Sequence, residues 1–189
     1  MARPLSEDKR TALLNAAVAA IATLGTAAST AKVAKDAGLG EGTLFVYFQT
    51  KDELLNQVFQ TLKDELRDAI TSDYPATASV KDRFAHIWDR RINWGATSPI
   101  KQKALRQLAV SEKLQPARET ATDADCRSIE TIFAEGFQTK VLRPQPVEFL
   151  VATIDNLAAM VLDMAEGSPD RLAEYKDLGW STLWGSISR

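Results

Sequence analysis

The sequence predicts an all-α protein of about nine helices, with a small N-terminal head followed by a larger helical domain. Apolar residues recur at three- and four-residue spacing along every long segment, as they do on one face of a helix. No stretch shows sustained alternation of apolar and polar residues, so no strands are expected. Glycines and prolines such as Gly25, Gly38, Pro75 and Gly167 fall between the periodic segments, where helices commonly end.

The composition favours a soluble cytoplasmic protein. Of 189 residues, 45% are hydrophobic and 25% charged, and the apolar runs contain polar breaks that make them shorter than a membrane span. The N-terminus lacks the apolar core of a signal peptide, and the single Cys126 excludes an intrachain disulfide. Although the net charge is −2, residues 1–51 carry six basic against four acidic side chains. This mildly basic end is the one suited to contact phosphates.

The first helix is expected to begin after Ser6, a good N-cap, and to end at Gly25. Ser29 caps the second helix, whose apolar face is short and whose last residues lead into Gly38. Gly40 then opens a third helix. Two short helices joined by a turn of three or four residues with a glycine form a helix-turn-helix, and Ala37-Gly38-Leu39-Gly40 has that length.

The third helix is expected to read DNA. Leu44 and Phe48 lie four residues apart and should face inward, which leaves Thr43, Phe45 and Tyr47 nearer the major groove. These aromatic residues could instead be ordinary core. One short helix cannot bury Phe45, Tyr47 and Phe48 together, however, so we favour DNA binding.

A capping box formed by Thr50 and Glu53 predicts a fourth helix that begins at Lys51 and runs to about residue 73. We interpret it as the connector between a DNA-binding domain, residues 1–51, and a regulatory and dimerisation domain, residues 52–189. Five more helices are expected over about residues 80–94, 99–114, 116–139, 146–166 and from 170 to the end.

Residues 30–54 read T-x-x-V-A-x-x-A-G-L-G-x-G-T-L-F-x-Y-F-x-x-K-x-x-L. Over about residues 8–55 the chain resembles the N-terminal domain of the tetracycline-repressor (TetR) family, and beyond that it is similar only in architecture. The resemblance implies a homodimeric transcription regulator. Such a regulator is usually a repressor that binds double-stranded operator DNA and releases it when a small molecule enters the C-terminal domain. Because the sequence has one histidine and no glycine-rich nucleotide loop, we expect neither an enzyme nor a cofactor.

The resemblance also implies roles for individual residues. Thr30 would contact the backbone or a base, Thr43 would reach into the groove, and Tyr47 and Lys51 would hold phosphates. Gly42 would permit close approach of the backbones. This chain departs from the common pattern in having Gly40 for serine and Phe45 for tyrosine. The residues expected at the DNA surface are Thr30, Lys32, Gly40, Glu41, Gly42, Thr43, Phe45, Tyr47 and Lys51.

Members of the family line their ligand pocket from the middle helices of the C-terminal domain. The candidate ligand-binding residues are Phe84, His86, Trp88, Arg91, Phe133, Phe137, Asn156 and Met160. Asn156 is an amide among apolar neighbours, so we expect it to be buried with a protein or ligand partner. The last helices carry more large apolar side chains than one layer covers, which indicates a homodimer interface. Its candidate residues are Leu162, Trp180, Leu183, Trp184 and Ile187.

Three alternatives stay open. Asp82 and His86 are one helical turn apart and could bind a metal ion, but two ligands are too few. A helical enzyme would need a catalytic cluster or a glycine-rich loop, and the sequence has neither G-x-S-x-G nor a Walker motif. A DNA-binding regulator without an effector, whose C-terminal domain only dimerises, is the main alternative, and a tightly packed core would favour it.

Overall fold

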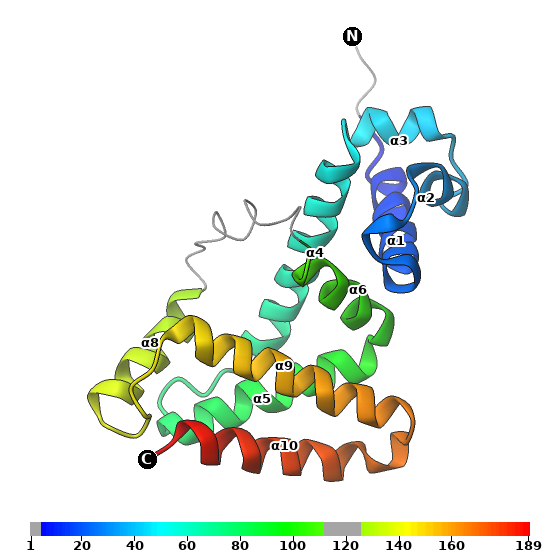
Figure 1. The fold of residues 1–189 in the computed structure, drawn as a ribbon. Helices are drawn as coiled ribbons and strands as arrows, with labels where there is room; N and C mark the ends of the chain where they lie inside the picture. Colours follow the sequence, from blue (N-terminus) through cyan, green and yellow to red (C-terminus); the bar gives the residue numbers. More distant parts are fainter. Residues whose placement is uncertain (1–4, 112–125) are drawn as a thin grey trace. The chain divides into compact units, whose positions relative to one another are not determined.

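The computed structural model describes residues 5–111 and 126–189, and within these ranges the protein has nine α-helices and two short 3₁₀ helices (Figure 1). The α-helices are α1 (Glu7–Leu24), α2 (Thr30–Asp36), α3 (Glu41–Tyr47), α4 (Lys51–Thr71), α5 (Val80–Thr97), α6 (Pro99–Ala109), α8 (Cys126–Gln138), α9 (Val147–Glu166) and α10 (Leu172–Ile187). The prediction of an all-α fold with an N-terminal helix-turn-helix is confirmed.

The described residues fall into two compact units. Unit 1 holds residues 5–65 and 98–111, and unit 2 holds residues 66–97 and 126–189. Helix α4 contributes residues to both units, and the sixth helix belongs to the unit that carries the helix-turn-helix. The boundary between the two compact units therefore does not coincide with the expected domain boundary at residue 51.

Unit 1 is built around α1, which packs against α2 and α6. Helix α1 ends at Gly25, whose φ of 61° lies in the left-handed region that glycine adopts without strain. By length and composition the segment Glu7–Ala27 is apolar enough to span a membrane, contrary to the expectation from its polar breaks. Its buried residues, which include Leu13, Ala17 and Ile21, lie in the core of unit 1.

Helix α4 begins as the capping box predicts. The hydroxyl of Thr50 accepts a hydrogen bond from the N–H of Glu53 at 3.0 Å. The carboxylate of Glu53 reaches one residue further back than in the usual motif, to the N–H of Gln49 at 2.7 Å. Two donors at the start of the helix are thereby satisfied, which fixes the point at which Lys51 enters the helix.

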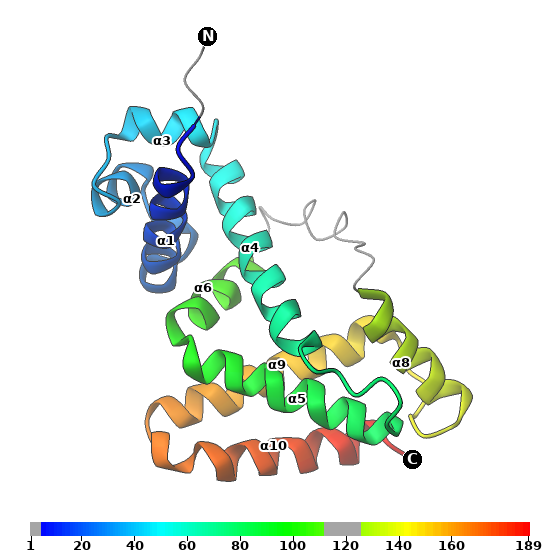
Figure 2. The same cartoon turned by 180° about the vertical axis from the view of Figure 1, so that it is seen from behind.

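Unit 2 encloses one apolar core between α5, α8, α9 and α10, and α9 and α10 lie side by side in both views (Figures 1 and 2). Glycine permits a close approach at the contact of α10 with α5 and α9. A methyl group on Gly179 would lie 2.6 Å from the ring of Trp88 and 2.8 Å from Val161. Gly95 of α5 has the same role, because a methyl group there would overlap Leu162 of α9.

Several predicted helix boundaries were wrong by a few residues. Helix α5 continues past Trp94 to Thr97, because Gly95 packs under Leu162 rather than breaking the helix. Helix α6 ends at Ala109 rather than near residue 114, where the N–H of Ser111 turns back to the carbonyl of Leu108. The predicted helix over 116–139 lies partly outside the described residues, and its described part is α8.

Candidate nucleic-acid interface

The turn between α2 and α3 has the geometry that the sequence predicts. The Ser29 hydroxyl accepts a hydrogen bond from the N–H of Lys32 at 3.2 Å and so caps α2. Gly38 has a φ of 70°, a conformation that side chains with a Cβ rarely adopt. Leu44 and Phe48 are buried in unit 1, as expected from their spacing. The opposite side of α3 therefore faces solvent.

The outward side of α3 combines apolar and hydroxyl groups. Phe45 is 43% exposed and Val46 is more so, while Thr43 and Tyr47 are half-buried. The Tyr47 oxygen accepts a hydrogen bond from the N–H of Ser6 at 3.0 Å. A phenol can accept and donate at once, so this bond positions the ring and leaves the O–H proton for an external acceptor such as a phosphate. No motif or spacing in the sequence indicates this bond.

The two glycines at the start of α3 are not required by the packing of unit 1. A methyl group on Gly40 or Gly42 would meet no atom within 4 Å, and neither residue has a positive φ. Gly38, by contrast, needs its glycine for the turn. The open space around Gly42 is consistent with the expectation that the DNA backbone approaches α3 closely at this residue.

Charged residues at this surface are partly paired with one another. Lys32 forms an ion pair with Asp36 at 2.8 Å across one turn of α2, and both side chains are exposed. Lys51 is the first residue of the 21-residue helix α4, whose N-terminal end attracts anions. Glu41 accepts a hydrogen bond from the Thr30 hydroxyl at 2.6 Å. All nine predicted DNA-surface residues thus lie on α2, α3, the residue before α3, or the start of α4.

The predicted ligand-binding aromatics lie in the core of unit 2. Phe84, Trp88 and Phe133 are buried, and the rings of Phe84 and Phe133 meet edge to face at 5.3 Å. The indole N–H of Trp88 donates to the carbonyl of Lys176 at 3.0 Å, which ties α5 to α10. Phe137 is half-buried against the same core. These side chains are held together by packing.

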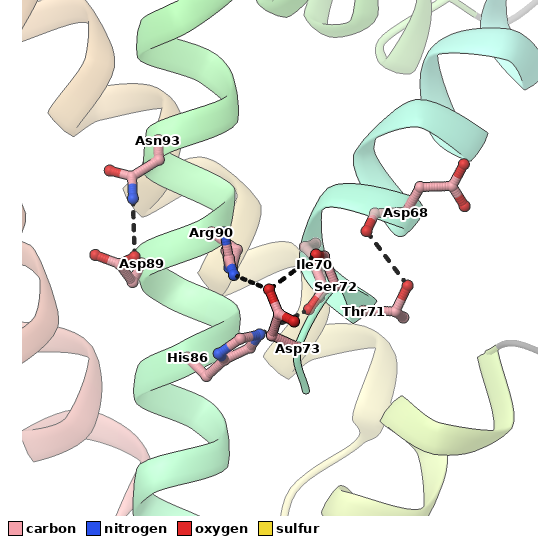
Figure 3. A network of polar contacts seen from close by, with 9 residues as sticks. All are labelled: Asp68, Ile70, Thr71, Ser72, Asp73, His86, Asp89, Arg90 and Asn93. Carbon is pink, nitrogen blue, oxygen red and sulfur yellow. Dashed lines mark hydrogen bonds and ion pairs between the residues drawn. The ribbon is translucent and has the colours of Figure 1, made fainter. Parts of the chain in front are cut away.

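His86 belongs to a polar network at the end of α4 (Figure 3). Its Nε2 lies 3.1 Å from the carbonyl oxygen of Ile70, so this nitrogen carries the proton and donates. Arg90, one turn along α5, forms an ion pair with Asp73 at 3.0 Å. No group of three or more metal-ligating side chains occurs within the described ranges, and Asp82 bonds to Ser79 instead. The network closes the turn between α4 and α5.

Two buried arginines are neutralised by partly exposed carboxylates. Arg83 pairs with Glu135 of α8, and this hydrogen bond raises the pKa of the guanidinium. The Nε of Arg91 lies 3.4 Å from the carboxylate of Asp155 on α9. Burial lowers the pKa of Arg91, while Asp155 opposes the shift. Both pairs link neighbouring helices of unit 2.

The expectation for Asn156 was wrong. Its side chain is exposed and donates to the carbonyl of Ala152 in its own helix at 2.8 Å. The apolar neighbours in sequence lie on other sides of α9, so the amide faces solvent. Met160, one turn further on, is also exposed at 49%. The structure therefore does not bring the eight candidate ligand residues together around one cavity.

The predicted dimerisation residues are divided between two environments. Leu183 and Ile187 are 1% exposed and pack in the core of their own unit. Leu162, Trp180 and Trp184 are half-buried against that core, and the two indoles stack with centroids 5.5 Å apart. The exposed large apolar residues of α9 and α10 are Phe149, Val151, Met160, Met164 and Leu178.

A hollow of about 280 Å³ in unit 2 is open to solvent. Its lining residues are Ala69, Ser72, Arg90, Asn93, Trp94 and Thr97. It lies next to the polar network of Figure 3, which supplies Ser72, Arg90 and Asn93. None of the eight candidate ligand residues lines it.

Comparisons with known proteins agree with this geometry. Residues 13–58 match the family of bacterial regulatory proteins called the tetR family. The chain is 25% identical to the uncharacterised HTH-type transcriptional regulator YhgD of Bacillus subtilis (strain 168), over 87% of this chain and 88% of that protein. A structure from Shewanella sp. PV-4, described as a tetR-family transcription regulator, has a TM-score of 0.86 at 24% identity and covers 96% of this chain and 98% of its own. The regulator FadR of Bacillus subtilis, solved with stearoyl-CoA, has a TM-score of 0.73 at 18% identity and covers 92% and 97%.

Proposed function

We propose that the protein, a DNA-binding transcriptional regulator of the TetR family, is a homodimeric repressor that a small molecule releases from a palindromic operator. The observation that carries the proposal is the outward surface of α2, α3 and the start of α4. It presents hydroxyls, an exposed aromatic ring and a lysine at a helix N-terminus, while Leu44 and Phe48 anchor it from behind. The protein would act in the cytoplasm, where its DNA is.

Each part of this surface has a distinct task in the proposal. Lys51 and the Tyr47 hydroxyl bind phosphates, which sets the position of α3 on the duplex. Thr43 and Phe45 enter the major groove, where a phenyl ring can contact a thymine methyl group. Gly42 allows α3 to approach closely, since open space surrounds its α-carbon. Most of the affinity would come from the phosphate contacts and would therefore fall as salt rises.

The dimer is proposed to form through the exposed sides of α9 and α10. Met160 and Met164 lie one helical turn apart on α9, and Leu178 of α10 is 57% exposed. Large apolar side chains rarely stay in water in such number on neighbouring helices. Two copies of this surface related by a two-fold axis would give an isologous four-helix interface. A dimer fixes the distance between two heads, which a pair of half-sites requires.

We propose that α4 transmits the effector signal, because it is one helix with residues in both units. An effector acts only to the extent that it binds one arrangement of the heads more tightly than another. FadR was solved with stearoyl-CoA, so a long-chain acyl-CoA is the first effector to test.

A DNA-binding regulator without an effector is the second candidate. The packing of Phe84, Trp88 and Phe133 in the core of unit 2 favours it, since these were the aromatics expected to line a pocket. In this candidate the C-terminal helices only pair two heads. The two proposals differ in whether any small molecule changes the affinity for DNA.

A gel-retardation assay with the DNA upstream of the protein's own gene tests the proposal. The wild type should retard the duplex, Tyr47→Phe and Lys51→Ala should weaken retardation, and a micromolar acyl-CoA should release the DNA. Equal retardation by the three proteins would refute the DNA surface. If the variants weaken retardation but no acyl-CoA of any chain length releases the DNA, the result favours a regulator without an acyl-CoA effector.

A further inference from the structure

Helices α2 and α3 are joined at their N-terminal ends by one hydrogen bond between side chains. Thr30 is the first residue of α2, Glu41 is the first residue of α3, and the Thr30 hydroxyl donates to Oε1 of Glu41 at 2.6 Å. Thr30 is half-buried, whereas Glu41 is exposed. Since Oε1 is engaged by Thr30, Oε2 is the carboxylate oxygen that is left for a partner outside the protein.

In a complex with DNA, the carboxylate of Glu41 is unfavourable unless a base donates a hydrogen bond to it. The N-terminal residues of a recognition helix are those that reach base edges, and Glu41 occupies the first position of α3. Phosphates repel a negative charge, so Glu41 cannot add to the backbone contacts made by Lys51 and Tyr47. Its possible stabilising partners are therefore hydrogen-bond donors on the bases.

The four bases differ sharply in the hydrogen-bond donors that their major-groove edges offer to a carboxylate. Cytosine presents its N4 amino group as a donor, whereas guanine presents two acceptors and thymine an acceptor beside a methyl group. Adenine has one donor, but its N7 acceptor lies next to it and would repel a second carboxylate oxygen. An isolated acceptor such as Oε2 is best matched by cytosine.

We infer that Glu41 is a base-reading residue that selects cytosine in each half-site, and that Thr30 is its positioning residue. The inference rests on the proposed operator binding and adds to it the identity of one base pair. A free glutamate side chain samples many rotamers, and the bond from Thr30 restricts it before DNA arrives, so less entropy is lost on binding. Thr30 then affects the choice of base through Glu41, to which its hydroxyl donates.

The same charge should suppress binding to other sequences. Where no cytosine amino group is present, Glu41 is left facing acceptors and phosphates. Glu41→Gln should therefore bind random duplex DNA more tightly than the wild type while discriminating less between sequences. Loss of specificity together with a gain in non-specific affinity is a combination that a weakened fold does not produce.

Selection from a pool of duplexes with 30 randomised base pairs tests the inference on the full-length protein. The wild type should enrich a symmetric motif with one position per half-site at which cytosine is preferred roughly tenfold. Glu41→Gln should lose that preference or change it to adenine, which an amide can bind through N6 and N7, with the other positions unchanged. Thermal unfolding of each variant confirms that equal amounts are folded.

Variants of Thr30 separate positioning from structure. Thr30→Val, which keeps the shape and removes the donor, should lower the cytosine preference roughly threefold, the effect of losing one hydrogen bond, and Thr30→Ser should restore it. Thr43→Val, a hydroxyl loss on α3 itself, should weaken binding and leave the cytosine position unchanged. An unaltered cytosine preference in Glu41→Gln, or none in the wild-type motif, would overturn the inference while operator binding stands. A wild type that enriches no motif would instead refute the proposed function.

Discussion

Gly42→Ala should make the protein more stable and a weaker DNA binder. A methyl group at this position meets no atom within 4 Å, so no clash opposes the substitution in the free protein. Alanine restricts the unfolded chain and suits a helix, which together stabilise by about 0.4–1 kcal/mol. On DNA the same methyl group would press against the duplex. If overpacking costs there what it costs in a protein core, about 1–3 kcal/mol, affinity falls roughly 5- to 150-fold.

Gly38→Ala is the matched control, because its surroundings are equally open but its φ is 70°. Alanine in this left-handed conformation costs about 1 kcal/mol or more, so the control should lose stability. Urea unfolding gives the stabilities, and fluorescence anisotropy with the upstream duplex gives the affinities. Once corrected for the folded fraction, Gly38→Ala should lose less DNA affinity than Gly42→Ala, because it adds no methyl group to α3. A Gly42→Ala protein with unchanged DNA affinity would refute the close approach of α3.

Three other predictions concern the packing and pairing of unit 2. Gly179→Ala should lose about 1–3 kcal/mol of packing against Trp88, partly offset by about 1 kcal/mol of helix propensity, as urea unfolding would show. Burial raises the pKa of Tyr74 above its ordinary value of 10.0. The neutral phenol therefore contributes fully to the free energy of unfolding below pH 10.0, and this contribution is lost as the pH rises through the raised pKa. Tyr74→Phe should remove this loss of stability at alkaline pH when unfolding is measured as a function of pH. Replacing Met160 and Met164 together by aspartate should give monomers in sedimentation, whereas a persistent dimer would place the interface elsewhere.

Local rules were sufficient to predict the helix-turn-helix from the sequence. Ser29, Gly38 and Thr50 each act through the few residues beside them, so the cap, the turn and the start of α4 could be placed without a structure. The inward side of α3 followed from the four-residue spacing of Leu44 and Phe48. The same spacing left Thr43, Phe45 and Tyr47 on the outward side. The family resemblance covered this part of the chain and added the expected roles of Thr30, Gly42 and Lys51.

Contacts between segments far apart in the chain could not be predicted in the same way. The bond from Ser6 to Tyr47 and the bond from Thr30 to Glu41 join residues 41 and 11 positions apart, and no periodicity encodes them. Asn156 shows a related weakness. Apolar sequence neighbours suggested burial, but on a helix the neighbours at one and two positions point to other sides.

Unit 2 showed most clearly where periodicity fails. The apolar stripe of α10 was assigned to a dimer interface, although Leu183 and Ile187 pack in the core of their own unit. An apolar side chain looks the same in a sequence whether it packs within one protomer or between two. The exposure of Met160, Met164 and Leu178 could be recognised only once the neighbouring helices were in place.

The salt dependence of DNA binding by Lys51→Gln tests the central claim most directly. With the upstream duplex, the variant should bind more weakly, and the slope of log K against log[salt] should be smaller by about one for each phosphate that the protein no longer neutralises. Lys81→Gln on α5 changes the net charge equally and should leave both quantities as in the wild type. If Lys51→Gln keeps the affinity and slope of the wild type, the start of α4 does not hold a phosphate, and the proposed DNA surface is contradicted.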